Sequence, residues 1–155
     1  MASFASLREA VDIPPVWLAG CLCLAWSQSQ LLPWPGDGGP AVQLAAGLLV
    51  GGGILLAVLA IDEMRRQKAT VIPHRVPEVL VQSGIFRRSR NPIYLGDLLI
   101  LAGFCLFWGA WWSLPLVPLL FWILADRFVA PEEARLHEKF GPAFEAYCAK
   151  TRRWA

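Results

Sequence analysis

The sequence is poor in the residues that hold metal ions or form disulfide bonds. It contains two histidines, His74 and His137, which lie far apart, and four cysteines. Cys21, Cys23 and Cys105 fall inside apolar segments, and no further Cys or His set accompanies the Cys21-x-Cys23 pair. Thiols in such positions provide neither zinc-ligand spacing nor a disulfide framework. The composition therefore argues against a metal site and against a fold stabilised by disulfide bonds.

The sequence also lacks the motifs of soluble nucleotide-binding and nucleic-acid-binding proteins. The glycines at positions 36–39 precede a proline and are typical of a turn, and Gly47-x-x-x-Gly51 lies inside an apolar segment. Neither stretch follows a strand and opens a helix, as a dinucleotide-binding loop does. The second motif favours close packing of membrane helices without fixing an oligomeric state. The net charge of only +2, without an aromatic–basic motif, indicates no nucleic-acid partner.

Charge is scarce as well, since 17% of the residues are charged and 56% are hydrophobic. Four apolar segments stand out, at 13–32, 41–61, 93–108 and 111–125. About 20 apolar residues cross the hydrocarbon core of a bilayer. The last two segments lack a charged residue between Asp97 and Asp126, and Gly109 and Pro115 mark a turn within that stretch. We therefore expect one all-α membrane domain over 1–155, with about four transmembrane helices, of which the last two form a tight hairpin.

The basic residues predict the orientation of this domain. Of 14 Lys and Arg residues, seven lie in 62–92 and six in 126–155. The positive-inside rule then places both termini and the middle loop in the cytoplasm, next to anionic membrane lipids. Asp12 and the Arg8-Glu9 pair make a poor signal-peptide n-region, so the first segment is predicted to be a retained span. We expect an integral protein of a bacterial inner membrane.

Two charged segments flank the predicted hairpin, at 83–96 and 131–136. Tyr94 and Asp97 share a helix face, and an acidic residue this deep in a span is costly unless it faces protein or water. Glu132 and Glu133 follow Pro131, where carboxylates complement the helix dipole. The apolar stripe that follows them predicts an amphipathic cytoplasmic helix on the membrane. These positions alone leave a purely structural role open, with the neighbouring arginines as lipid anchors.

Taken together, the two segments carry a more specific pattern. Arg90-Asn91-Pro92-x-Tyr94-x-Gly96, a hydrophobic hairpin and Glu132-Glu133-x-x-Leu136 follow one another, and then Phe140-Gly-x-x-Phe144-x-x-Tyr147. This order resembles the isoprenylcysteine carboxyl methyltransferase family, most of all its short bacterial branch, over residues 70–154. The resemblance implies a membrane enzyme that uses S-adenosylmethionine (SAM), bound in a cytoplasm-facing pocket built from 70–96 and 126–154.

The resemblance also implies roles for individual residues. The cofactor contacts it implies are Val79, Leu80, Val81, Phe86, Asn91, Pro92, Tyr94, Glu132 and Glu133. Asn91 replaces a histidine of the eukaryotic pattern, and Arg127 lies one residue out of register with an arginine on the acceptor side. An acidic acceptor would be held by Arg127 or Arg90, whereas an amine or thiol acceptor would need a proton acceptor such as Asp97 or Glu133. The chemistry requires no metal.

The sequence thus predicts a membrane methyltransferase that moves the methyl group of SAM to a small lipophilic acceptor, with an isoprenylcysteine-like carboxylate as the leading candidate. A phospholipid N-methyltransferase is the alternative enzyme. A non-catalytic membrane subunit or scaffold is the alternative of another class.

Overall fold

The computed structural model describes residues 12–33, 36, 38–69 and 79–155, and these residues form helices and loops without strands. The helices are α2 (Pro14–Leu31), α3 (Gly39–Arg66), α4 (Pro92–Phe107), α5 (Leu116–Leu124), α6 (Ala130–Phe140) and α7 (Pro142–Lys150). Shorter turns are η1 (Gly84–Arg87), η2 (Trp111–Ser113) and the π-helical η3 (Ala125–Val129). The predicted all-α class is confirmed for these residues. The part of the expected cofactor segment at 70–78 lies outside them.

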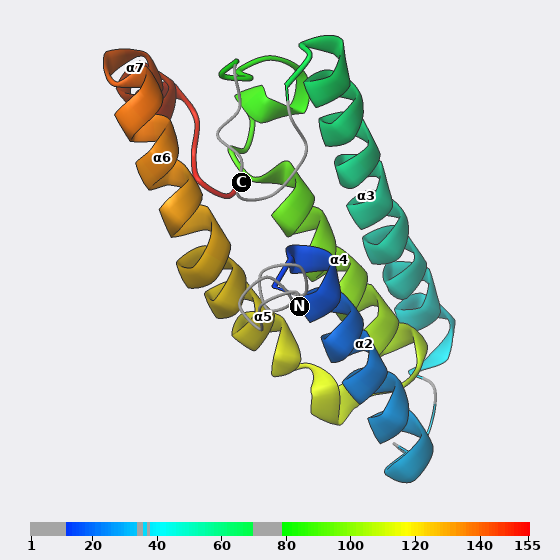
Figure 1. Cartoon of the computed structure of the whole chain (residues 1–155). Helices are drawn as coiled ribbons and strands as arrows, with labels where there is room; N and C mark the ends of the chain where they lie inside the picture. Colours follow the sequence, from blue (N-terminus) through cyan, green and yellow to red (C-terminus); the bar gives the residue numbers. More distant parts are fainter. Residues whose placement is uncertain (1–11, 34–35, 37, 70–78) are drawn as a thin grey trace, which may run out of the picture.

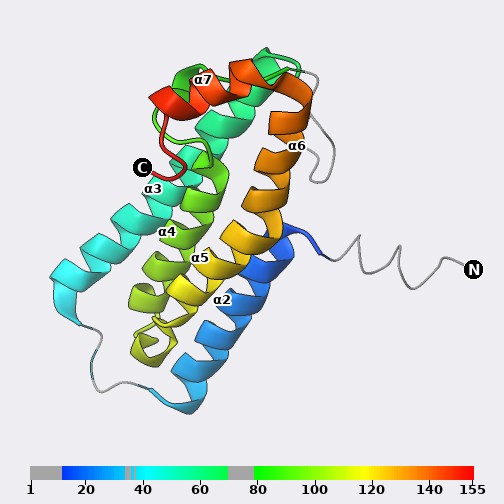
Figure 2. The same cartoon turned by 90° about the vertical axis from the view of Figure 1, so that its left-hand side faces the viewer.

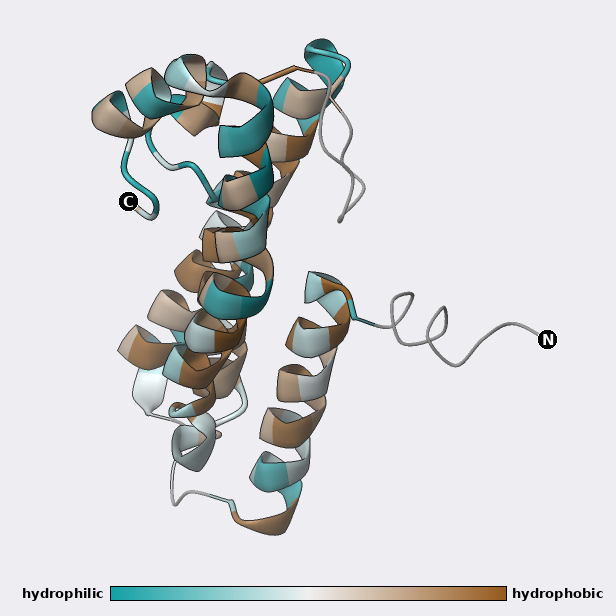
Figure 3. Ribbon diagram, turned by 60° about the vertical axis from the view of Figure 1, so that its left-hand side comes forward, coloured by the Kyte–Doolittle hydropathy of each residue, from teal (hydrophilic) through white to brown (hydrophobic). Residues whose placement is uncertain are grey.

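The long helices form a bundle, and α7 lies across one end of it (Figures 1 and 2). Helix α4 lies between α3 and the α5–α6 helix, and α2 packs against α4 and α5. We call the end formed by α7, the last turn of α3 and the loop before α4 the head end. Hydrophilic residues gather there, whereas α2 and the opposite ends of the other helices are mainly hydrophobic (Figure 3).

Helices α3 and α4 approach closely because glycines face each other across their contact. A Cβ atom added to Gly53 would lie 2.5 Å from the Gly96 carbonyl oxygen, and one added to Gly103 would lie 2.6 Å from Val50 Cγ2. In contrast, a Cβ added to Gly47 or Gly51 would meet nothing within 4 Å. The close contact between α3 and α4 is therefore made by Gly53, Gly96 and Gly103, and not by the Gly47-x-x-x-Gly51 motif.

The predicted hairpin is present, but its second arm is longer than expected. Helix α4 ends at Phe107, Gly109 takes a left-handed φ of +63°, and α5 begins at Leu116. The sequence predicted a span that ended at 125 and a new helix opened by Pro131. That boundary is wrong, because the backbone stays helical from 116 to 140. The wider π turn η3 lies where the ring of Pro131 would otherwise crowd the preceding turn, so the proline does not break the helix.

Two helical stretches of the described residues are long and apolar enough to cross a membrane, Gly39–Arg66 and Trp111–Phe140. Helix α4 is apolar but shorter. Large apolar side chains of α3 are exposed, among them Leu44, Leu48 and Leu55. Such a surface suits lipid rather than water. The buried core lies where α2, α4 and α5 meet, and its residues include Ala25, Leu101, Cys105, Leu120 and Leu124.

Candidate functional site

A pocket opens at the head end, between the end of α3, the loop before α4, and the helices α6 and α7. The space it encloses, together with the open solvent at its mouth, is about 530 Å³. The lining residues are Met64, Ala69, Val79, Leu80, Val81, Phe86, Arg90, Asn91, Glu132, Glu133, Leu136, Phe144 and Tyr147. Segments separated by the whole hairpin thus meet at one cavity.

The wall at 79–86 is fastened to the last turns of α3. The Glu63 carboxylate accepts hydrogen bonds from the Ser83 hydroxyl and, at 2.9 Å, from Gln67 Nε2. Gly84 follows with a left-handed φ of +56°, and a Cβ there would lie 2.6 Å from Glu63 Oε2. The left-handed φ favours glycine at this bend. The bend fixes the position of Phe86 and of the apolar residues before it.

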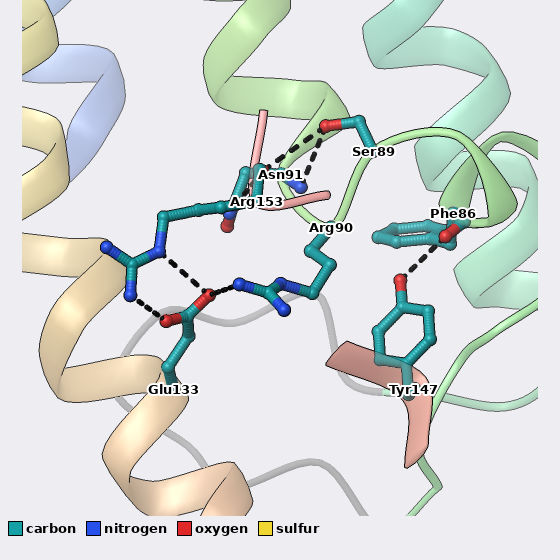
Figure 4. A network of polar contacts seen from close by, with 7 residues as sticks. All are labelled: Phe86, Ser89, Arg90, Asn91, Glu133, Tyr147 and Arg153. Carbon is teal, nitrogen blue, oxygen red and sulfur yellow. Dashed lines mark hydrogen bonds and ion pairs between the residues drawn. The ribbon is translucent and has the colours of Figure 1, made fainter. Parts of the chain in front are cut away.

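Glu133 joins two arginines at the pocket (Figure 4). Its Oε1 lies 3.0 Å from Arg90 Nη2 and accepts a 3.2 Å hydrogen bond from Arg153 Nε, while Arg153 Nη2 binds the other oxygen. The Arg90 side chain is only 13% exposed. Among the described residues, its buried Nε–H has no hydrogen-bond acceptor. Buried donors normally have a hydrogen-bond acceptor, and an oxygen atom of a bound ligand could accept this one.

Asn91 and Pro92 start α4 at the edge of the pocket. Pro92 is buried at the first position of the helix, where its fixed φ and missing N–H are tolerated. The Asn91 side chain donates a 2.9 Å hydrogen bond to the carbonyl oxygen of Arg153. Asn91 lines the pocket as well. Its position therefore connects the pocket to the segment that follows α7.

Tyr94 and Asp97 occupy one face of α4, in consecutive turns. The Tyr94 hydroxyl donates a 3.2 Å hydrogen bond to Glu132 Oε2 across the site. Asp97 lies one turn deeper and is 9% exposed. No described residue donates a hydrogen bond to the Asp97 carboxylate. The structure thus brings Tyr94 and Glu132 together. Of the described residues, Glu132 lines the pocket, whereas Pro92, Tyr94 and Asp97 do not.

Arg127 lies in the π turn η3, away from the pocket lining. Its Nε is 2.8 Å from both carboxylate oxygens of Asp12. The guanidinium also lies 5.7 Å from the centre of the Trp17 ring, and Trp17 Nε1 donates a 3.0 Å hydrogen bond to Asp12. Arg127 therefore links η3 to the start of α2.

Tyr147 and Phe144 of α7, together with Leu136 of α6, are pocket residues that the sequence did not single out as such. The Tyr147 hydroxyl donates a 2.7 Å hydrogen bond to the Phe86 carbonyl oxygen, and burial raises the pKa of Tyr147 to about 12. These side chains belong to the apolar stripe that we had interpreted as a membrane-facing surface. The sequence shows the apolar stripe, but it does not show that the stripe covers a pocket.

A model of the family described as phospholipid methyltransferase matches residues 42–143, about two thirds of the chain. The chain belongs to the phospholipid methyltransferase family. This is a family of membrane methyltransferases related to the isoprenylcysteine carboxyl methyltransferases, so the resemblance found in the sequence is confirmed. No curated protein and no solved structure matches the chain.

The family match covers most of the pocket. It includes α3 from residue 42 onwards, the loop before α4, the hairpin and α6, and ends at 143, just before Phe144 and Tyr147. The membership and the long apolar helices together identify a membrane methyltransferase.

Proposed function

We propose that this protein is an integral-membrane methyltransferase that binds SAM in the head-end pocket and methylates a lipophilic acceptor. The observation that carries the proposal is the convergence of residues 79–91 with Glu132 and Glu133 on one cavity. These residues come from both halves of the sequence motif. If the basic loop served only to anchor the protein to lipid, it would not need to form a cavity together with Glu132 and Glu133.

The side chains at the pocket suit the parts of SAM. The unsatisfied Nε–H of Arg90 can donate to the carboxylate of the methionine portion. The Glu132 carboxylate can accept hydrogen bonds from an amino group or from ribose hydroxyls. The apolar wall at 79–81 and the aromatic ring of Phe144 offer a surface for adenine. The set contains a cation, a carboxylate and an apolar wall, so it fits the cofactor.

The bound cofactor would supply an activated methyl group, and the residues of this chain would orient and enclose it. Tyr94 and Glu132 join α4 to α6 at the site and fix the distance between the two walls. Tyr147 closes a further side by its bond to Phe86. Positioning and exclusion of water account for large rate enhancements without a metal. Pro92 and Glu133 act here by holding Asn91 and Arg90, respectively.

The first acceptor candidate is a carboxylate on a lipophilic molecule, as in the isoprenylcysteine enzymes. Such an acceptor is deprotonated at neutral pH and needs no base, but it needs a cation to hold it. Arg90 and Arg127 are the cations that the sequence motif suggested for this role. In the structure each has a carboxylate partner, Glu133 and Asp12 respectively.

The second candidate is an amine, as in phospholipid N-methylation, and one observation favours it. Asp97 is a buried carboxylate without a hydrogen-bond donor among the described residues, one turn below the Tyr94–Glu132 bond. A carboxylate there can attract an ammonium group and accept its proton before transfer. The two candidates differ in the product, a methyl ester or an N-methyl amine.

Two measurements test the proposal. Calorimetry on the protein in detergent should detect binding of S-adenosylhomocysteine, weakened in Glu132→Gln and unchanged in Glu138→Gln, an exposed glutamate of the same helix. Membranes given methyl-labelled SAM and a lipid extract should then yield one labelled lipid. Mild alkali releases the label from an ester and leaves an N-methyl amine intact. Binding without any labelled product would favour a non-catalytic subunit, and absence of binding would reject the proposal.

The membrane topology belongs to the same proposal. Four spans would be α2, α3, α4 and the α5–α6 helix, in a bacterial inner membrane with both chain ends in the cytoplasm. The basic residues at the head end support this orientation, among them Arg65, Arg66 and Lys68 beside the end of α3. Reporter fusions at 36 and at 155 should report opposite sides of the membrane. Reporters on the same side would reject the four-span arrangement.

A further inference from the structure

Residues 151–154, which follow α7, run back across the loop that leads into α4, and we call them the strap. Arg90 donates a backbone hydrogen bond to the carbonyl oxygen of Arg152 at 3.0 Å. The carbonyl oxygen of Arg153 accepts hydrogen bonds from Asn91 Nδ2 at 2.9 Å and from the Ser89 hydroxyl at 3.5 Å (Figure 4). Segments more than 60 positions apart in the chain thus hold each other.

The loop depends on these contacts because it is buried and irregular. Ser89 is 3% exposed and Asn91 is 8% exposed, yet neither lies in a helix. Buried backbone groups need hydrogen-bond partners. The N–H groups of Arg88 and Ser89 bond to Ile85, whereas that of Arg90 bonds to the strap. The strap therefore accepts the backbone hydrogen bond of Arg90, a loop residue that lines the pocket.

The strap also reaches the charged side chains of the pocket. Arg153 binds both oxygens of Glu133, and Glu133 in turn binds Arg90. Arg90 is consequently restrained twice, through its backbone by Arg152 and through its guanidinium by the Glu133 carboxylate that Arg153 holds. A binding residue restrained in advance loses less entropy when the ligand arrives.

The strap is anchored at both of its ends. At the first, Thr151 donates a 2.9 Å backbone hydrogen bond to Tyr147, and its hydroxyl donates to the Arg87 carbonyl oxygen at 3.5 Å. At the other, the Trp154 ring lies 4.7 Å from the Phe121 ring of α5, between centroids, and packs against the buried core. Neither Arg153 nor Trp154 is among the described residues that line the pocket.

We propose that the strap positions Arg90 and Asn91 for cofactor binding, with Arg153 and Trp154 as positioning residues that do not touch the cofactor. This inference rests on the proposed function. Loss of the strap removes hydrogen bonds from the pocket loop, so we expect the dissociation constant for the cofactor to rise about tenfold. The turnover number at saturating cofactor should change less than the dissociation constant, because neither Arg153 nor Trp154 lines the pocket.

The test uses the full chain in detergent and S-adenosylhomocysteine as the probe. Arg153→Gln removes the guanidinium and leaves the backbone acceptor, while Trp154→Ala removes the anchor. The controls are Arg88→Gln, at an exposed arginine, and Trp122→Ala, at an exposed tryptophan of the helix that carries Phe121. Calorimetry gives the dissociation constant, and thermal unfolding without ligand reports stability. A chain that ends at Thr151 removes most of the strap.

The inference holds if Arg153→Gln and Trp154→Ala bind the probe about tenfold more weakly, if this loss of affinity exceeds what their loss of stability accounts for, and if both differ from the controls. Trp154→Phe should restore most of the affinity. Binding within twofold of wild type in both variants would overturn it, even if the shortened chain fails to fold. The inference would also be overturned if the loss of stability in these variants accounted for their whole loss of affinity. If the wild-type protein itself does not bind the probe, the proposed function fails instead.

Discussion

The hydroxyl of Tyr94 in α4 donates a hydrogen bond to the carboxylate of Glu132 in α6, 38 positions later in the chain. The two residues lie on opposite sides of the hairpin and belong to the two halves of the motif read from the sequence. Their bond is therefore the most direct link between those halves. It joins the helix that begins at Pro92 to the helix that carries both pocket glutamates.

We expect Tyr94→Phe to weaken binding of S-adenosylhomocysteine about tenfold, because a hydrogen bond to a charged group contributes about 1.5–3 kcal/mol. Glu132→Gln should weaken it at least as much, since Glu132 also lines the pocket. The loss of affinity in the double variant should be smaller than the sum of the two single losses, because Tyr94→Phe removes the bond and Glu132→Gln weakens the same bond by removing its charge. Calorimetry on all three proteins measures this. Fully additive losses would show that the bond does not serve the cofactor.

The Glu133 carboxylate should be far more important for stability than a surface acid. Glu133→Ala leaves the Arg90 guanidinium with neither solvent nor carboxylate, and breaking such a buried pair costs about 3 kcal/mol. The matched comparison is Asp62→Ala, which breaks the Arg66–Asp62 pair of 2.8 Å, whose side chains are 72% and 52% exposed. That change should cost less than about 0.5 kcal/mol. Thermal unfolding without ligand should show a large shift for the first variant only.

A methyl group at Gly96 should separate α3 from α4. A Cβ there would lie 2.6 Å from the Gly53 carbonyl oxygen, and backbone cannot move aside as a flexible side chain can. We expect Gly96→Ala to destabilise the protein by about 1–3 kcal/mol. Gly47→Ala should be neutral or slightly stabilising, because its Cβ meets nothing and alanine favours helix. Thermal unfolding in detergent compares the two, and equal shifts would contradict the close contact of α3 and α4.

Much of the fold could be predicted because membrane helices depend on long apolar runs. The predicted span at 93–108 differs by one residue at each end from α4, and the turn marked by Gly109 is in place. The end of the last span was not predictable in the same way. A proline such as Pro131 is common at the first position of a helix, so it predicts a helix start. No residue type in the sequence predicts the π turn that allows the helix to continue through Pro131.

Several side chains of the sequence motif line the pocket, whereas the contacts that depend on backbone atoms could not be predicted. Asn91 was expected at the pocket, and it is there. Its bond to the Arg153 carbonyl could not be foreseen, since every residue carries such an oxygen. Tyr147 was visible only as part of an apolar stripe. That pattern is the same for a helix on a membrane and for a helix that closes a pocket.

The sequence and the structure suggest different roles for Arg127. The resemblance implies that it faces the acceptor, whereas in the structure it binds both oxygens of Asp12 and joins η3 to α2. We expect Arg127→Gln and Asp12→Asn to act alike, with dissociation constants for S-adenosylhomocysteine within twofold of wild type and equal changes in the acceptor KM. The reason is that each variant breaks the same half-exposed ion pair, which contributes less than about 1 kcal/mol. An Arg127 that holds a carboxylate acceptor would behave differently. Arg127→Gln would then raise the acceptor KM strongly, and Asp12→Asn, which frees the guanidinium, would lower it.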